Sequence, residues 1–171
     1  MKKIVFIGFL GLASVTTTVS AHEGHRHRHD KAGDQHNATA VADAPVSQDL
    51  TVSSCWIRSL PLPAPSAGYF VAKNSGANAV KLVGAASPSY GMVMLHQTTN
   101  HDGLSKMSMA DAIDIPAGSE LEFKPGGYHA MLEKPQADIP VGSTVMMDFM
   151  LDNGQKASAQ CEVKSAKTMA H

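Results

Sequence analysis

Residues 144–164 read TVMMDFMLDNGQKASAQCEVK, and they carry the clearest strand pattern of the chain. Every second position from Val145 to Leu151 is a large apolar residue, which is the period of a strand with one buried face. Asn153-Gly154 follows directly, and this dipeptide is typical of a two-residue hairpin turn because both residues tolerate a positive φ angle. The stretch therefore predicts a β-hairpin that turns one face toward a hydrophobic core.

Similar strand-like segments extend upstream as far as Asp49, with turn signals between them. Asp102-Gly103 is a second hairpin dipeptide, and residues 116–118 and 125–127 are breaks rich in Pro and Gly. The predicted strands are Leu50–Ile57, Ala67–Lys73, Val80–Ala86, Met92–Gln97, Leu104–Met109, Ser119–Phe123, Tyr128–Leu132, Thr144–Leu151 and Ala157–Lys164. Short strands without a long helical period predict an all-β sandwich or barrel.

The composition limits the classes of function. The chain has 171 residues, which is room for one domain. Lys and Arg total 14 against 15 for Asp and Glu, so a generally basic nucleic-acid binder is excluded and no nucleic-acid partner is expected. The counts of 10 Met, 9 His and 2 Cys are unusual. A chain rich in thioether and imidazole but poor in thiol suggests soft-metal handling outside the cytosol.

The first 21 residues have the parts of a secretory signal peptide. Met1-Lys2-Lys3 is positive, Ile4–Val15 is apolar, and Val19-Ser20-Ala21 is a small-residue cleavage pattern. The apolar run of about 12 residues is shorter than the roughly 20 that a membrane span needs. We therefore expect export to the periplasm with cleavage after Ala21, and no membrane-spanning segment. A buried N-terminal helix is the alternative.

The expected layout has four parts. Residues 1–21 are the signal peptide, and residues 22–47 are a His-rich flexible arm without a helix or strand period. Residues 48–165 are the β domain, and residues 166–171 are a short polar tail. We expect the mature protein to be a monomer.

Cys55 and Cys161 form an even pair, one near each end of the β domain. In an oxidising compartment this arrangement favours a disulfide. Two buried free thiols are the alternative. No Cys-x-x-Cys occurs, so a thioredoxin-type redox motif is excluded.

Four residues form a candidate metal site: His96, Met107, His129 and Met131. His129 and Met131 are two positions apart on a predicted strand and so share a face. His96 and Met107 lie on neighbouring strands, joined through the Asp102-Gly103 hairpin. Thioethers select Cu(I), whereas Mg²⁺ and Ca²⁺ prefer oxygen ligands and Zn²⁺ sites are built mainly from Cys, His and carboxylates. The set therefore predicts a Cu(I) site.

The spacing of these four residues is a specific motif. Ten residues separate His96 from Met107, 21 separate Met107 from His129, and one separates His129 from Met131. This spacing resembles that of the periplasmic copper chaperone family often called PCuAC, over about Asp49 to Lys164. The surrounding segments are also similar: Cys55-Trp56-Ile57-Arg58, Gly68-Tyr69-Phe70 and Lys124–Leu132. Family members often carry Met directly after the first His, and here that position is Gln97.

The resemblance implies a cupredoxin-like Greek-key barrel or sandwich that binds one Cu(I) through the four motif residues. It also implies a chaperone that delivers copper to the binuclear copper centre of cytochrome c oxidase. The expected partner is the copper-bearing subunit of that oxidase or another copper chaperone.

The arm is a second candidate metal site. Its histidines are His22, His25, His27, His29 and His36. Cleavage after Ala21 would add the free α-amine of His22 to this set. Nitrogen ligands suit Cu(II), Zn²⁺ or Ni²⁺ better than Cu(I), so the arm is interpreted as a capture site for Cu(II). A solvated tract with weak, unselective metal affinity is the alternative.

A copper carrier is favoured over an enzyme, because no nucleophile motif and no His-Glu-x-x-His is present. Two alternatives stay open. A periplasmic copper buffer that serves metal resistance would use the same residues. A copper-dependent redox enzyme would use His22 with a second His, but the other arm histidines lie on the same flexible segment.

Overall fold

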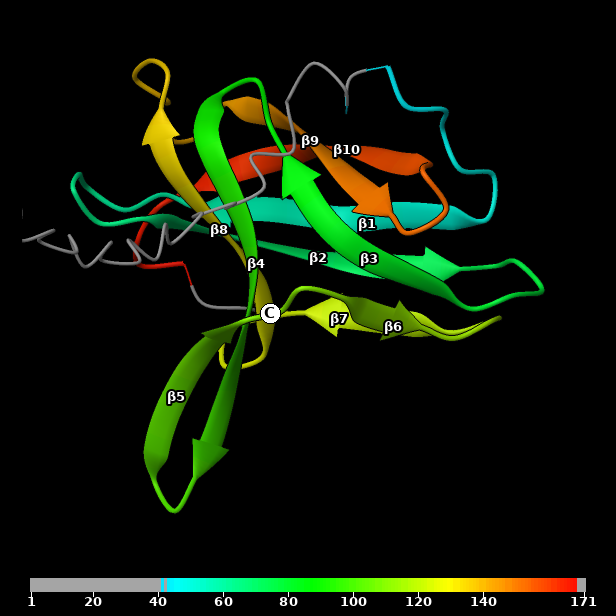
Figure 1. Cartoon of the computed structure of the whole chain (residues 1–171). Helices are drawn as coiled ribbons and strands as arrows, with labels where there is room; N and C mark the ends of the chain where they lie inside the picture. The colour runs from blue at the N-terminus through cyan, green and yellow to red at the C-terminus, as the bar shows by residue number, and fades with distance from the viewer. Residues whose placement is uncertain (1–40, 42, 169–171) are drawn as a thin grey trace, which may run out of the picture. The chain divides into compact units, whose positions relative to one another are not determined.

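The computed structural model describes residue 41 and residues 43–168, and it is an all-β domain, as predicted (Figure 1). Its strands are β1 (Leu50–Arg58), β2 (Ser66–Asn74), β3 (Val80–Ala86), β4 (Tyr90–His101), β5 (Leu104–Met109), β6 (Ile113–Ile115), β7 (Glu120–Phe123), β8 (Tyr128–Pro135), β9 (Thr144–Leu151) and β10 (Lys156–Lys164). No helix of the described part is long and apolar enough to cross a membrane.

The strands form one sheet in the order β5-β4-β8-β2-β1-β10-β9-β3-β6, with β7 paired to β2. The β1–β10 pair is parallel and the other pairs are antiparallel. The sheet curves around its core, and within the described residues no ladder of hydrogen bonds joins its two outer strands (Figure 1). The arrangement is therefore an open barrel, with β5 as one free edge.

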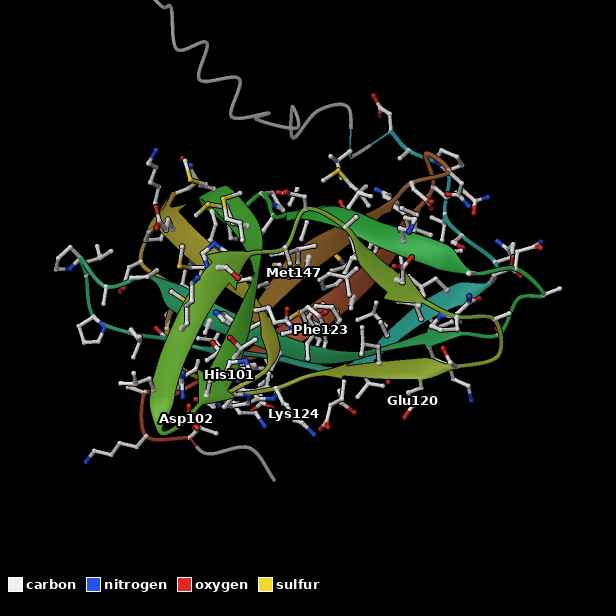
Figure 2. All side chains as sticks on the ribbon, turned by 60° about the horizontal axis from the view of Figure 1, so that its bottom comes forward. His101, Asp102, Glu120, Phe123, Lys124 and Met147 are labelled. Atoms are coloured by element: carbon white, nitrogen blue, oxygen red, sulfur yellow. A yellow bond between two sulfur atoms is a disulfide. The ribbon has the colours of Figure 1, made fainter. Side chains whose placement is uncertain are left out.

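The predicted hairpin of β9 and β10 is present, but residues 152–154 form a three-residue loop in place of the expected two-residue turn, because Leu151 still pairs with Gln155. Gly154 has a φ angle of 79°, and the strands pair from Met150 opposite Lys156 onward. Met147 and Phe149 are buried, and Figure 2 shows Met147 in the interior together with Phe123 of β7. Burying each such side chain stabilises the fold by about 1.5–3 kcal/mol.

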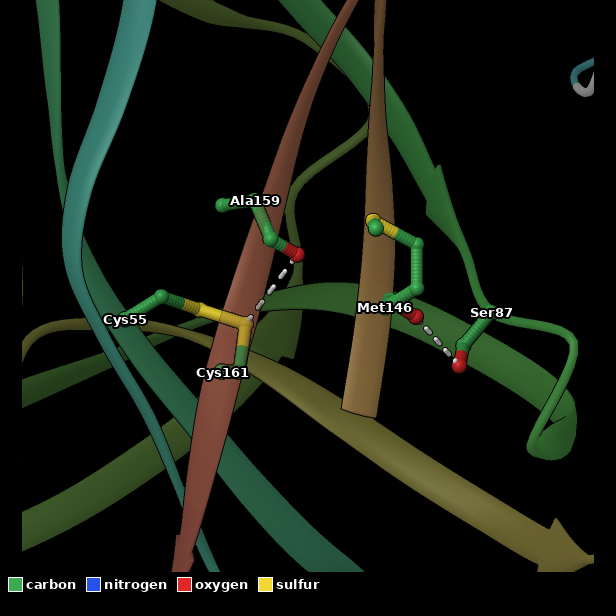
Figure 3. The surroundings of a disulfide bond; sticks show 5 residues. All are labelled: Cys55, Ser87, Met146, Ala159 and Cys161. Atoms are coloured by element: carbon green, nitrogen blue, oxygen red, sulfur yellow. Dashed lines mark hydrogen bonds between the residues drawn. A yellow bond between two sulfur atoms is a disulfide. The ribbon is translucent and has the colours of Figure 1, made fainter. Parts of the chain in front are cut away.

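Cys55 of β1 and Cys161 of β10 form a disulfide (Figure 3). The parallel pairing of β1 and β10 places Trp56 opposite Glu162, so the preceding cysteines are neighbours with Cα atoms 4.4 Å apart. The disulfide thus joins two adjacent central strands whose cysteines are separated by 106 positions in the sequence.

The structure differs from the sequence expectation at two places. Residues 113–115 form the short strand β6, which pairs with β3 and has a pattern too brief to recognise in the sequence. The end of the expected arm pairs with β10: Lys156 donates its amide to Pro45 O at 2.9 Å, and Ser47 donates its amide to Lys156 O at 2.7 Å. The predicted signal peptide, the histidines of the predicted arm and residues 169–171 lie outside the described residues.

The hairpin of β4 and β5 extends away from the rest of the sheet (Figure 1). Asp102 and Gly103 form its turn with φ angles of 50° and 79°, as the dipeptide predicts, and Figure 2 shows Asp102 and His101 at its tip. All residues of β5 are exposed, and among the described strands β5 pairs only with β4. The predicted metal ligands lie on this hairpin and on the neighbouring β8.

Candidate metal centre

The four predicted ligands lie on three adjacent strands. His96 is on β4, Met107 is on β5, and His129 and Met131 are on β8, while β4 lies between the other two strands. His96 is directly opposite His129. Residues that face each other across two strands project to the same side of the sheet, so the two imidazoles share one face.

This shared face is the outer one. The next residues along the two strands, Leu95 and Ala130, also face each other and belong to the buried hydrophobic core. Because side chains alternate along a strand, the histidines project away from that core. We call the outer surface of β5, β4 and β8 the ligand face.

The two imidazoles form a close pair. Their ring centroids are 5.8 Å apart with an interplanar angle of 77°, and the residues are only 6% and 8% exposed. Nδ1 of His129 lies 3.1 Å from the carbonyl oxygen of Gly127. A carbonyl only accepts hydrogen bonds, so Nδ1 is the donor, and Nε2 is the ring nitrogen that remains for a metal ion. A hydrogen bond from the other ring nitrogen to a carbonyl fixes the ring orientation of a metal-binding histidine.

His96 has two buried ring nitrogens that lack a hydrogen-bond partner among the described residues. Leaving a buried polar group unsatisfied costs about 1–3 kcal/mol, so such a group is expected to have a ligand. Burial lowers the pKa of His96, the nearby His129 lowers it further, and Glu133 opposes the shift. The neutral imidazole is therefore favoured, and this is the form that binds metal ions.

An aromatic row connects the histidines to the centre of the sheet. The rings of Tyr69 and His129 lie 6.4 Å apart, and Tyr69 in turn packs against Trp56 at 4.6 Å. Arg58 donates a hydrogen bond to the Tyr69 hydroxyl at 2.7 Å. Trp56 directly follows the disulfide cysteine Cys55. The segments around Trp56 and Tyr69 therefore pack beside the imidazole pair and support it.

The two predicted thioether ligands lie on either side of this pair and differ in exposure. Met107 is 54% exposed and lies opposite Thr98, two positions along β4 from His96. Met131 is half-buried on the other side of the histidines. The structure therefore brings all four predicted residues to one face and places the histidines between the two methionines.

Three further methionines of the ligand face, Met92, Met94 and Met109, were not among the four predicted ligands. Met109, which is 63% exposed, lies directly opposite His96, and Met94 lies directly opposite Met131. The Asp102-Gly103 turn carries the signal for Met109, because a two-residue turn fixes the register of its hairpin. No comparable signal identifies Met94, because β4 and β8 are distant in the sequence.

The ligand face suits a soft, singly charged ion. Among the described residues, no group of three or more His, Cys, Asp or Glu side chains is arranged to hold a metal ion. Two imidazoles with neighbouring thioethers favour Cu(I). The histidines of the predicted arm lie outside the described residues.

A family model described as "Putative lipoprotein LpqE-like" matches residues 50–163. The chain is also 36% identical over 93 residues to an uncharacterized protein, RP573, of Rickettsia prowazekii, with 53% of this chain and 51% of that protein covered.

Two solved structures are similar to the domain. The Cu(I) form of the protein DR1885 from Deinococcus radiodurans is 30% identical with a TM-score of 0.54, covering 72% of this chain and 81% of that one. The apo PCuAC domain of PmoF2 has a TM-score of 0.59 at 21% identity, covering 75% of this chain and 98% of that domain. The expected cupredoxin-like fold is thereby confirmed.

Proposed function

The chain belongs to the LpqE-like family of PCuAC-type domains, and from this premise we propose that it is an exported copper chaperone. Its cargo is Cu(I), held on the ligand face of β5, β4 and β8. The Cu(I) form of the similar protein DR1885 supports copper as the cargo.

The observation that carries this proposal is the buried His96–His129 pair. One imidazole has no hydrogen-bond partner among the described residues, and the other is oriented by a carbonyl so that Nε2 is available. Met107 and Met131 flank the pair. We assign His96, Met107, His129 and Met131 as the ligands of the primary Cu(I) site.

The exposure of the site supports a carrier. The imidazoles are buried, but Met107 is on the exposed edge strand β5, where a partner's ligands can reach it. Cu(I) can leave such a site by stepwise exchange of thioethers. A base, a nucleophile or an enclosed substrate cavity has no role in this process, so we propose a carrier and not an enzyme.

The expected recipient is the copper-bearing subunit of cytochrome c oxidase, or another copper chaperone that supplies it. This assignment rests on the PCuAC resemblance of the motif, together with the signal-peptide pattern of residues 1–21. Residues 22–47 add His22, His25, His27, His29 and His36, which we propose as a capture site for Cu(II).

Competition with a chromophoric Cu(I) chelator tests the primary site in the full mature chain. The double variant Met107→Ala/Met131→Ala should lose high-affinity Cu(I) binding. The matched control is Met146→Ala, because Met146 is a partly exposed methionine on β9, away from the ligand face. Unchanged affinity in the double variant would overturn the assignment.

Deleting residues 22–36 tests the arm separately. The shortened chain should take up less Cu(II) and keep its Cu(I) affinity, as measured by titration of each ion. Loss of both activities would show that the arm completes the Cu(I) site.

A further inference from the structure

Three methionines form a second cluster on the ligand face. Met94 of β4 lies directly opposite Met131 of β8, and Met92 is two residues before Met94 on the same side of β4. All three are half-buried, yet none belongs to the hydrophobic core formed by the described residues. They therefore cover one another at the outer surface.

The backbone register brings these three side chains within reach of one ion. Residues directly opposite each other have Cβ atoms about 4.5–5.5 Å apart, and diagonal neighbours are about 7–8 Å apart. Positions i and i+2 of a strand are separated by roughly 6.6 Å. Methionine is unbranched and has three rotatable bonds, so the three sulfur atoms can turn toward a common point.

The charge beside the cluster suits a cation. Glu133 of β8 lies directly opposite Met92, on the same face of the sheet. Three thioethers are neutral, so an ion bound to them keeps its full positive charge in a half-buried place. The carboxylate of Glu133 offsets that charge.

We propose that Met92, Met94 and Met131 form a second Cu(I) position that contains only sulfur ligands. This inference rests on the proposed function of the ligand face and adds a thioether site beside the imidazole site. Thioether ligands select Cu(I) over Zn²⁺ and over harder ions. The chain then holds two Cu(I) ions on one face of the sheet.

Met131 is the residue that the two positions share. It is two residues from His129 and directly opposite Met94, so it borders both sites. When both are occupied, Met109 can replace Met131 in the primary site, because Met109 lies directly opposite His96. The two imidazoles, Met107 and Met109 then bind one ion. Met92, Met94 and Met131 bind the other.

The test is an anaerobic titration of the mature chain with Cu(I) against a competing chelator, which counts the tightly bound ions. The variant Met92→Leu/Met94→Leu should bind one ion fewer than the wild type. The control Met146→Leu/Met150→Leu should bind as many as the wild type, because these two methionines are on β9. If the double variant fails to fold, Met94→Leu alone should give the same loss.

A second variant separates this inference from the proposed function. His96→Ala/His129→Ala should keep one Cu(I), with an X-ray absorption spectrum that shows sulfur ligands only. If Met92→Leu/Met94→Leu binds as many ions as the wild type, the second position is wrong, while loss of an ion in the histidine variant still supports the primary site. If removing the histidines changes neither the count nor the ligands, the primary site is wrong.

Discussion

The centre of the sheet and its β5 edge are held in different ways. At the centre, β1 and β10 are paired on both sides and joined by the Cys55–Cys161 disulfide. At the edge, β5 is paired on one side and fully exposed. The imidazoles of the candidate site are supported from the centre through Tyr69, whereas Met107 lies on the edge. The candidate site therefore has a fixed half, the two imidazoles, and an accessible half at Met107.

Removing the disulfide should have the largest effect, and it should affect stability alone. In the chain-entropy model, a crosslink between residues 106 positions apart contributes about 4–5 kcal/mol. Cys55→Ala/Cys161→Ala should therefore lower the free energy of unfolding by about that amount in a urea titration. The Cu(I) affinity of the folded fraction should not change. A parallel loss of affinity would show that the disulfide also determines the site.

Replacing the buried imidazoles should lower Cu(I) affinity without lowering the stability of the fold as the loss of the disulfide does. His129→Ala should lower Cu(I) affinity by at least about 100-fold, because even outer-shell partners of a metal site contribute 10–100-fold. His96→Leu should do the same, while raising the apo stability by about 1 kcal/mol, because it removes two buried nitrogens without partners. Chelator competition and thermal unfolding measure the two quantities.

The neighbouring Gln97→Ala is the control for these histidine variants. Gln97 follows His96 on β4 and so projects to the other side of the strand. It should leave Cu(I) affinity unchanged. If His96→Leu instead destabilises the apo protein by several kcal/mol, His96 is a packing residue and the unsatisfied nitrogens do not indicate a ligand.

The exposed thioether should contribute less than an imidazole. Met107→Leu keeps the size of the side chain and removes the sulfur, and it should lower Cu(I) affinity about tenfold, or about 1.4 kcal/mol. It should also speed the release of Cu(I) to a chelator, by a smaller factor than it weakens binding, because the imidazoles still hold the ion. An unchanged affinity would indicate that Met109, and not Met107, is the exposed thioether ligand.

A change in the turn of the β4–β5 hairpin should have the smallest effect. Gly103→Ala requires an alanine at a φ angle of 79°, which costs about 1 kcal/mol, although nothing lies within 4 Å of the new Cβ. Amide hydrogen exchange in β5 should become faster, and Cu(I) affinity should fall about twofold because the imidazoles remain in place.

Gly118→Ala is the matched control for the turn variant. Its φ angle is 67°, its Cβ would also meet nothing within 4 Å, and it lies in the turn between β6 and β7. It should cost similar stability without any effect on copper. Equal effects of the two variants on affinity would contradict a special role for the β5 edge.

Local patterns in the sequence predict much of this fold. The alternation in residues 144–151 and the Asn153-Gly154 turn predict the β9–β10 hairpin, and Asp102-Gly103 predicts the other one. Residues 113–115 were missed because three residues are too few to show a period. The pairing of β1 with β10 is also hidden, because it joins distant segments and depends on the packing of the whole core.

The candidate site also has residues that local sequence predicts and residues that only long-range strand pairing reveals. The spacing pattern predicts His96, Met107, His129 and Met131 as ligands, and the hairpin register adds Met109 opposite His96. Met94 becomes a neighbour of Met131 only through the pairing of β4 with β8. The missing hydrogen-bond partners of His96 are a property of the packed structure, and residue types do not reveal them.

X-ray absorption of the mature chain loaded with one equivalent of Cu(I) tests the central claim most directly. We expect a Cu(I) edge with both nitrogen and sulfur bound to the ion, and loss of the nitrogen contribution in His96→Ala/His129→Ala. A first shell with nitrogen or oxygen alone, unchanged when those two histidines are replaced, would contradict it.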